Sequence, residues 1–184
     1  SEATEVYMLN KMLASPSASR YFDESTGTMT VKSIEKLVRQ AKLSTPTIRQ
    51  VTVKGKKYYV ILAHGYALKG LKNDVDFVNY NKDARARGAD NPLIQGADFI
   101  IDGALIYEYN RPELLMTGNK VRTLLLGAQA GALAWGQKPA WYEKDFDYDR
   151  IPGVATDMLI GFEKTKFNSE DYGVLALDNS YTAD

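Results

Sequence analysis

Hydrophobic residues recur at helical spacing in two stretches near the start of the chain. The first runs over residues 5–14 and ends at Ser15-Pro16, where a proline stops a helix. The second begins after Thr30, a good N-cap residue, and ends at Leu43 before Thr45-Pro46. Its apolar stripe consists of Val31, Ile34, Leu37, Val38 and Ala41, and charged residues occupy the opposite side. We therefore predict two amphipathic helices.

The period then changes to two, which favours strands. Residues 47–63 predict a β-hairpin around the turn Lys54-Gly55-Lys56, and residues 65–78 predict a short helix. Residues 79–91 are polar and predict an exposed loop. Further strands are expected on both sides of Asp102-Gly103, and in the tail on both sides of Asn168-Ser169.

A third helix is predicted over Lys120–Trp135. Its inward positions would be Val121, Leu124, Leu125, Ala128, Ala132 and Leu133, and Gly136 would be the C-cap. Gly127 and Gly131 form a G-x-x-x-G pair in this stretch. The apolar run is too short to cross a membrane, so the pair indicates close packing against a sheet or another helix.

Composition narrows the function. The chain has 184 residues, 45% of them hydrophobic, and 23 basic residues balance 23 acidic ones. A zero net charge argues against a general electrostatic binder of nucleic acid or membranes. The first 60 residues nevertheless carry ten basic and five acidic groups, whereas residues 141–184 carry four and ten. Either these are ordinary solvated faces, or opposite charges meet between neighbouring copies.

Candidate catalytic chemistry is sparse. There is no cysteine, and the single histidine, His64, is expected to be structural. No phosphate-binding, dinucleotide-binding or hydrolase motif occurs. Two alternatives stay open: a small soluble hydrolase with a carboxylate pair drawn from acids such as Glu108, Asp145 and Asp147, or a ligand-binding module lined by some of the 12 tyrosines.

Acidic residues alternate over 143–149 and predict a half-exposed acidic strand. Calcium binding in the manner of an EF-hand is disfavoured, because Arg150 and Thr156 stand where that loop needs Gly and Glu. Two small basic clusters are expected in solvated loops or in contact with phosphate or an acidic neighbour. The candidate inter-subunit contacts are Lys54, Lys56, Lys57, Lys82, Arg85, Arg87, Glu143, Asp145, Asp147 and Asp149.

Several segments, taken in order, carry a family resemblance. They are the hairpin 53–60 before His64, the stretch 91–96, the strand 102–108, the segment 124–130 with Trp135-Gly136, and residues 171–174. This ordered set resembles the major capsid proteins of tailed phages of the N-four-like type. It runs from about Thr30 to the end of the chain.

The resemblance implies an α+β, HK97-like capsid fold with mixed and antiparallel sheets. Residues 1–46 would form a peripheral-type helical segment with a spine-type helix at 30–43, residues 47–171 an axial-type α/β region with its helix at 121–135, and residues 172–184 a C-terminal strand and tail. It also implies a structural protein rather than an enzyme, with no cofactor, that self-assembles into an icosahedral shell around double-stranded DNA.

The implied partners are further copies in hexamers and pentamers, a decoration or scaffolding protein, and DNA through non-specific contacts, with no membrane. The implied location is the virion, and the host cytoplasm during assembly. The chain is shorter than full subunits of the family and begins with Ser1, so we expect a truncated or processed subunit or a minimal relative. The pattern reveals no long N-terminal arm and no extended two-stranded loop.

Overall fold

The helices lie in the first two thirds of the chain and only strands follow from residue 115 onward, which agrees with the predicted α+β class. The computed structural model describes residues 2–53, 55–79, 99–148 and 150–182. The helical elements are α1 (Glu2–Leu13), η1 (Ala18–Arg20), α2 (Val31–Leu43), α3 (Gly65–Lys72) and η3 (Pro112–Leu114). The strands are β1 (Tyr21–Glu24), β2 (Val51–Val53), β3 (Lys56–Ala63), β4 (Phe99–Ile101), β5 (Ala104–Glu108), β6 (Leu115–Met116), β7 (Lys120–Leu126), β8 (Gly131–Phe146), β9 (Ile151–Lys164), β10 (Lys166–Phe167), β11 (Glu170–Asp171) and β12 (Val174–Ser180).

The body of the molecule is built on one mixed sheet. Its strands follow the order β1-β12-β7-β3-β5-β4, with β2 paired to β3 and β6 paired to β7. The pairs β1–β12 and β3–β5 are parallel, and the other neighbouring pairs are antiparallel. The hairpin predicted over 47–63 is confirmed as β2 and β3. The strands predicted around Asp102-Gly103 are confirmed as β4 and β5.

Helix α2 covers one face of this sheet. The hydroxyl oxygen of Thr30 accepts a hydrogen bond from the backbone N–H of Ser33, which confirms the predicted N-cap. All five residues of the predicted apolar stripe are at most 1% exposed and pack into a core with Ile61, Leu125 and Leu177. Each of the four larger side chains contributes about 1.5–3 kcal/mol through burial, so this face anchors the fold.

Helix α1 covers the opposite face. Leu9 and Leu13 of this helix pack with Leu124 of β7 and with Val174 and Ala176 of β12. Because successive side chains of a strand point to opposite faces, β7 and β12 contribute apolar residues to both cores. Helices of the same chain therefore cover both faces of the sheet. Helix α2 covers one face, and α1 covers the other.

The predicted helix over Lys120–Trp135 is wrong. Residues 120–126 form strand β7, and residues from 131 onward form strand β8. Strand β7 lies between β12 and β3 and is buried on both faces, so its apolar residues run continuously instead of alternating. Such a run fits a helix and a buried strand equally well. Gly136 is consequently no C-cap, and it lies within β8 at a shift in register.

The glycine pair in this segment does mark close packing, although not between helices. A Cβ atom on Gly127 would collide with Ile48 Cγ2 and lie 2.6 Å from the carbonyl oxygen of Arg49. Over Gly131, the ends of the Phe162 and Met12 side chains occupy the space that a Cβ would need, at 2.5 and 2.8 Å. Both glycines thus permit a neighbour to approach the backbone.

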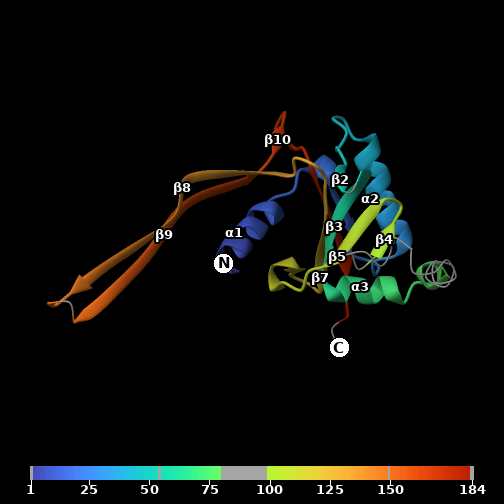
Figure 1. Cartoon of the computed structure of the whole chain (residues 1–184). Helices are drawn as coiled ribbons and strands as arrows, with labels where there is room; N and C mark the ends of the chain where they lie inside the picture. Colours follow the sequence, from blue (N-terminus) through green and yellow to red (C-terminus); the bar gives the residue numbers. More distant parts are fainter. Residues whose placement is uncertain (1, 54, 80–98, 149, 183–184) are drawn as a thin grey trace.

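Strands β8 and β9 leave the body together as a long two-stranded arm (Figure 1). They have 16 and 14 residues, and within the described part of the chain they pair only with each other. The expectation that the chain has no recognisable extended two-stranded loop is therefore wrong, because β8 and β9 form one. The predicted acidic strand is confirmed for Glu143–Phe146, which end β8, but it is exposed on both faces rather than half-exposed.

Replacement of Gly127 by alanine is expected to destabilise the fold by about 1–3 kcal/mol, because the added methyl group overpacks the contact with Ile48. Urea denaturation of the purified protein measures this change. Gly161→Ala is the matched control, since no atom lies within 4 Å of its Cβ position. Equal midpoints for the two variants would contradict the close approach at Gly127.

Candidate assembly interface

The arm displays apolar side chains to solvent along most of its length. Trp141 and Leu159 are each 64% exposed, and Val154 is 59% exposed. The other large exposed apolar residues of its two strands are Leu133, Trp135, Tyr142, Phe146, Ile151 and Met158. An isolated two-stranded ribbon is only marginally stable in water, and a continuous exposed apolar patch normally marks an interaction surface. The arm therefore has the properties of a surface that another polypeptide covers.

One face of the arm is the more apolar. Val154, Met158, Ile160 and Phe162 alternate along β9 and so share a face. Trp135 and Leu133 stand directly opposite Ile160 and Phe162 on β8 and extend this face across both strands. At the base of the arm, Met12 of α1 lies over it. The same apolar face thus begins as part of the body's packing and continues outward without cover.

A buried ion pair fixes the base of the arm. Lys164, the last residue of β9, is 4% exposed, and its Nζ lies 2.9 Å from Oδ2 of Asp171, which is 1% exposed. The ammonium group also donates hydrogen bonds to the carbonyl oxygens of Ala14 and Ser15, just after α1. The Asp171 carboxylate accepts a further bond from the backbone N–H of Ser17. These bonds join the arm, α1 and the segment before β1 at one point.

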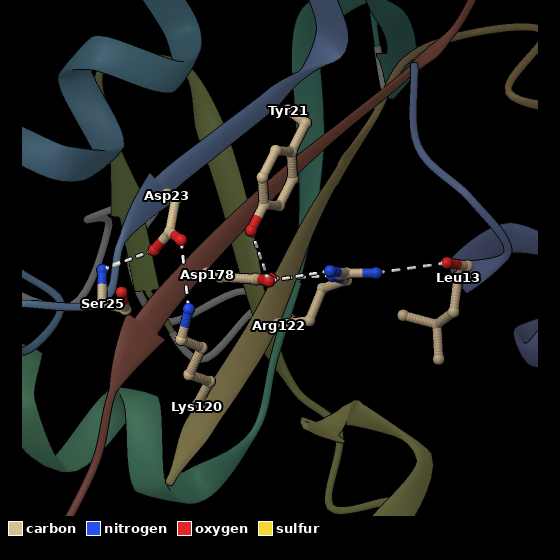
Figure 2. A network of polar contacts seen from close by, with 7 residues as sticks. All are labelled: Leu13, Tyr21, Asp23, Ser25, Lys120, Arg122 and Asp178. Carbon is tan, nitrogen blue, oxygen red and sulfur yellow. Dashed lines mark hydrogen bonds and ion pairs between the residues drawn. The ribbon is translucent and has the colours of Figure 1, made fainter. Parts of the chain in front are cut away.

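A second polar network ties α1 to the sheet (Figure 2). Arg122 of β7 donates two hydrogen bonds of 2.7 Å to the buried carboxylate of Asp178 on β12, and Tyr21 of β1 donates a third of 2.9 Å. Nη1 of Arg122 reaches the carbonyl oxygen of Leu13 at the end of α1. The hydrogen bonds that Arg122 donates to Asp178 raise the pKa of Arg122, and burial raises the pKa of Tyr21. The three strands and the helix end are therefore connected.

Asp23 lies beside this network. Its carboxylate accepts a hydrogen bond from the backbone N–H of Ser25 at 2.9 Å and lies 3.1 Å from Nζ of Lys120 (Figure 2). Hydrogen bonds from Ser25, and then the one from Lys120, lower the pKa of Asp23 from 3.8 to about 2. Asp23 is therefore ionised at neutral pH, and its ion pair with Lys120 links β1 to β7 across the intervening strand β12.

The acidic residues predicted as contacts lie at the outer end of the arm. Glu143 and Asp145 are exposed on β8, and Asp147 is exposed in the turn that follows. Lys56 and Lys57 are exposed at the start of β3, on the body. The other predicted contacts lie outside the described residues: Lys54, Lys82, Arg85, Arg87 and Asp149, together with most of the loop predicted over 79–91.

Most of the chain matches a known protein family. The Phage capsid protein family matches residues 14–182. The major capsid protein of Pseudomonas phage KPP25 is 32% identical over 148 residues, which cover 70% of this chain and 39% of that protein. The chain belongs to the phage capsid protein family.

Solved structures show the same fold. The capsid of Ralstonia phage GP4 superposes with a TM-score of 0.71 at 24% identity, over 92% of this capsid chain and 54% of that one. The cyanophage Pam1 capsid gives 0.75 at 23% identity, over 90% and 55%. The capsid of Helicobacter pylori bacteriophage KHP30 gives 0.72 at 18% identity, over 97% and 65%.

These comparisons confirm the predicted HK97-like α+β capsid fold and the resemblance to phage major capsid proteins. They agree with the prediction of a structural protein rather than an enzyme. The capsid chain spans about 39% of its curated relative and little more than half of two of these solved chains.

The geometry does not support the two alternative functions. Glu108 ends β5 in the central sheet, whereas Asp145 and Asp147 lie at the end of the arm, so they form no catalytic pair. His64 has a structural role, since its Nδ1 accepts a hydrogen bond from the N–H of Tyr66 at the start of α3. Burial lowers the pKa of His64. The comparisons name neither a hydrolase nor a ligand-binding module.

Replacing Lys164 with methionine is expected to destabilise the capsid chain by about 3–5 kcal/mol, because it leaves the buried carboxylate of Asp171 without its counter-ion. Denaturant unfolding followed by circular dichroism measures the loss. Lys11→Met is the control: Lys11 also links α1 to β9, through an exposed pair with Glu163, and should change stability by less than about 1 kcal/mol.

Removing Lys120 is expected to raise the pKa of Asp23 above about 2, although the bonds from Ser25 keep it below 3.8. A carboxyl group whose pKa is lower in the folded than in the unfolded state stabilises the fold when the pH is above the unfolded-state pKa. That stabilisation disappears as the pH falls through the folded-state pKa. The contribution of Asp23 is therefore complete above pH 3.8 and lost as the pH falls to about 2. Carboxyl ¹³C NMR titration of Lys120→Met checks the shift. An unchanged pKa would show that Ser25 alone sets it.

Proposed function

We propose that the chain is a shell-building part of a phage major capsid protein, whose copies associate into an icosahedral head that encloses double-stranded DNA. The observation that carries this proposal is the arm of β8 and β9, with its uncovered apolar face. Family membership and the shared fold support it. In the assembled head, further capsid polypeptide covers the arm, because water cannot stabilise a two-stranded ribbon with this composition.

The remaining assignments follow from this role. The protein belongs in the virion and reaches it through assembly in the host cytoplasm. Its partners are copies of itself in hexamers and pentamers, with a decoration or scaffolding protein as an additional partner. Packaged DNA is contacted only non-specifically, in keeping with the zero net charge. In the part of the chain that the structure describes, no helix combines the length and apolar character needed to cross a bilayer.

We also propose that the chain is divided into three regions. Residues 1–46 are the peripheral-type segment, 47–171 the axial-type region and 172–184 the C-terminal strand and tail. Helix α2 packs on the same core as β3, β7 and β12, so any boundary at residue 46 lies within a shared hydrophobic core. The proposed inter-subunit contacts are the ten residues predicted from the sequence: Lys54, Lys56, Lys57, Lys82, Arg85, Arg87, Glu143, Asp145, Asp147 and Asp149.

Polar substitution of the arm is expected to prevent shell formation while leaving the fold intact. Trp141→Ser with Val154→Ser removes two exposed apolar side chains on adjoining positions of the arm. Because both are exposed in the single chain, the melting temperature should change little, whereas the assembled fraction should fall about tenfold or more. Velocity sedimentation and electron microscopy of the expressed capsid protein measure the assembled fraction.

Val75→Ser serves as the control, because Val75 is 70% exposed on the body rather than on the arm. Normal shells from the arm variant would contradict a role for this face. Loss of shells together with a large drop in melting temperature would instead show that the arm stabilises the single chain.

A further inference from the structure

A hollow lined by cations lies on the body where α2 ends and β3 begins. Its volume is about 490 Å³, and its lining includes Lys42, Arg49 and Lys57, which lie on three successive segments of the chain. Arg49 and Lys57 are exposed, and their side chains form no hydrogen bond or ion pair with any described residue. Lys42 has a partner, Asp102, at 3.6 Å on the surface. The hollow thus presents two cations, Arg49 and Lys57, that no described residue neutralises.

The floor of this hollow is fixed by the core. Ile48 and Tyr59 are at most 2% exposed, and the Tyr59 hydroxyl donates a hydrogen bond of 3.1 Å to the carbonyl oxygen of Ile48. The carbonyl oxygen of Arg49 accepts a 2.7 Å bond from the N–H of Ala128. The backbone that carries Arg49 is therefore held in place, so only the side-chain torsions of Arg49 have to be ordered when its guanidinium binds a carboxylate.

The complementary charge is at the outer end of the arm. Glu143, Asp145 and Asp147 are exposed, and none forms an ion pair with another described residue. The cations near them are Lys144 and Arg150, of which Lys144 lies over the ring of Phe146 at 5.4 Å. Acids outnumber bases over residues 143–150 by four to two, so the tip is negative.

The tip cannot meet the hollow of its own chain. Figure 1 shows the end of the arm and strands β2 and β3 at opposite ends of the molecule. The Lys164–Asp171 pair joins the base of the arm to the body. Any contact between the tip and the hollow therefore joins two different copies.

We propose that the acidic tip of the arm of one copy, Glu143, Asp145 and Asp147, docks into the cationic hollow formed by Lys42, Arg49 and Lys57 of a neighbouring copy. This proposal rests on the proposed shell function and names the partner of the arm tip. Arg49 binds a tip carboxylate through its two-pronged guanidinium, and Lys57 neutralises a second acid. Each copy has one tip and one hollow, so the contact repeats head to tail and can close into a ring.

A carboxylate partner fits better than DNA. The chain as a whole has no net charge, and the hollow is a local group of cations, whereas a surface that follows a phosphate backbone needs an extended basic stripe. The opposite charges also occur in equal copy number in a shell of identical subunits.

Cross-linking between copies tests the contact directly. The 184 residues contain no cysteine, so engineered thiols are unambiguous. Capsid protein with Asp147→Cys is assembled together with protein carrying Arg49→Cys and treated with a short bismaleimide. We expect mixed dimers at least about tenfold above the control mixture of Asp147→Cys with Lys32→Cys, since Lys32 is exposed on α2 away from the hollow. Equal yields in the two mixtures would overturn the proposal.

Charge reversal supplies a second readout. Arg49→Glu with Lys57→Glu should reduce the assembled fraction about tenfold at low salt, and adding Asp145→Lys with Asp147→Lys to the same chain should restore it. The wild-type contact should weaken as salt is raised. Normal assembly of the Arg49→Glu, Lys57→Glu variant would overturn the proposal. So would normal assembly with less packaged DNA, which would assign the hollow to DNA.

Failure of the proposed shell function and failure of the proposed tip contact give different experimental results. If the wild-type protein forms no shells, the proposed function fails. If wild-type shells form and the Trp141→Ser, Val154→Ser variant is defective while cross-linking and charge reversal have no effect, the arm contributes to assembly and only the assignment of its tip is wrong.

Discussion

The architecture depends on the buried ion pair between Lys164 and Asp171, because the projecting arm and the folded body meet there. Removing two charges from water is costly, and apolar residues of similar size would often stabilise a protein as well. Hydrogen bonds are directional, however, and the Lys164 ammonium group contacts the end of α1 while Asp171 contacts the segment before β1. The pair therefore sets the direction in which the arm leaves the body, which apolar packing alone would define less sharply.

The body and the arm place the same kinds of apolar residue in opposite environments. In the body, apolar side chains on both faces of the sheet are covered by helices of the same chain. In the arm, tryptophan, leucine and valine side chains remain open to solvent over two paired strands. The described residues thus form covered cores in the body and leave an uncovered apolar surface on the arm. For a family whose members build shells, this division couples the order of the arm to association with other polypeptide.

The sequence predicted α2 well, because its N-cap at Thr30 and its apolar stripe are local signals that burial against one face of a sheet leaves intact. It failed at β7, because a strand between two others loses its alternation, and a run such as Leu124-Leu125-Leu126 then resembles a helix. The arm was missed because register shifts near Gly136 and Pro139 interrupt its period. The partnership of Lys164 with Asp171 and the position of Arg49 in a hollow depend on tertiary contacts, for which the sequence has no local signal.

The position of β12 in the sheet determines when the body can finish folding. It is the last strand described, yet it lies in the sheet between β1, which comes from the first 24 residues, and β7. Until the ribosome has released residues 174–180, β1 has no partner and both hydrophobic cores lack their contributions from β12. Contacts between such distant parts of a chain form late in folding. A nascent chain consequently cannot complete its body before residues 174–180 have left the ribosome, and the native surface that it presents to other subunits forms only after that point.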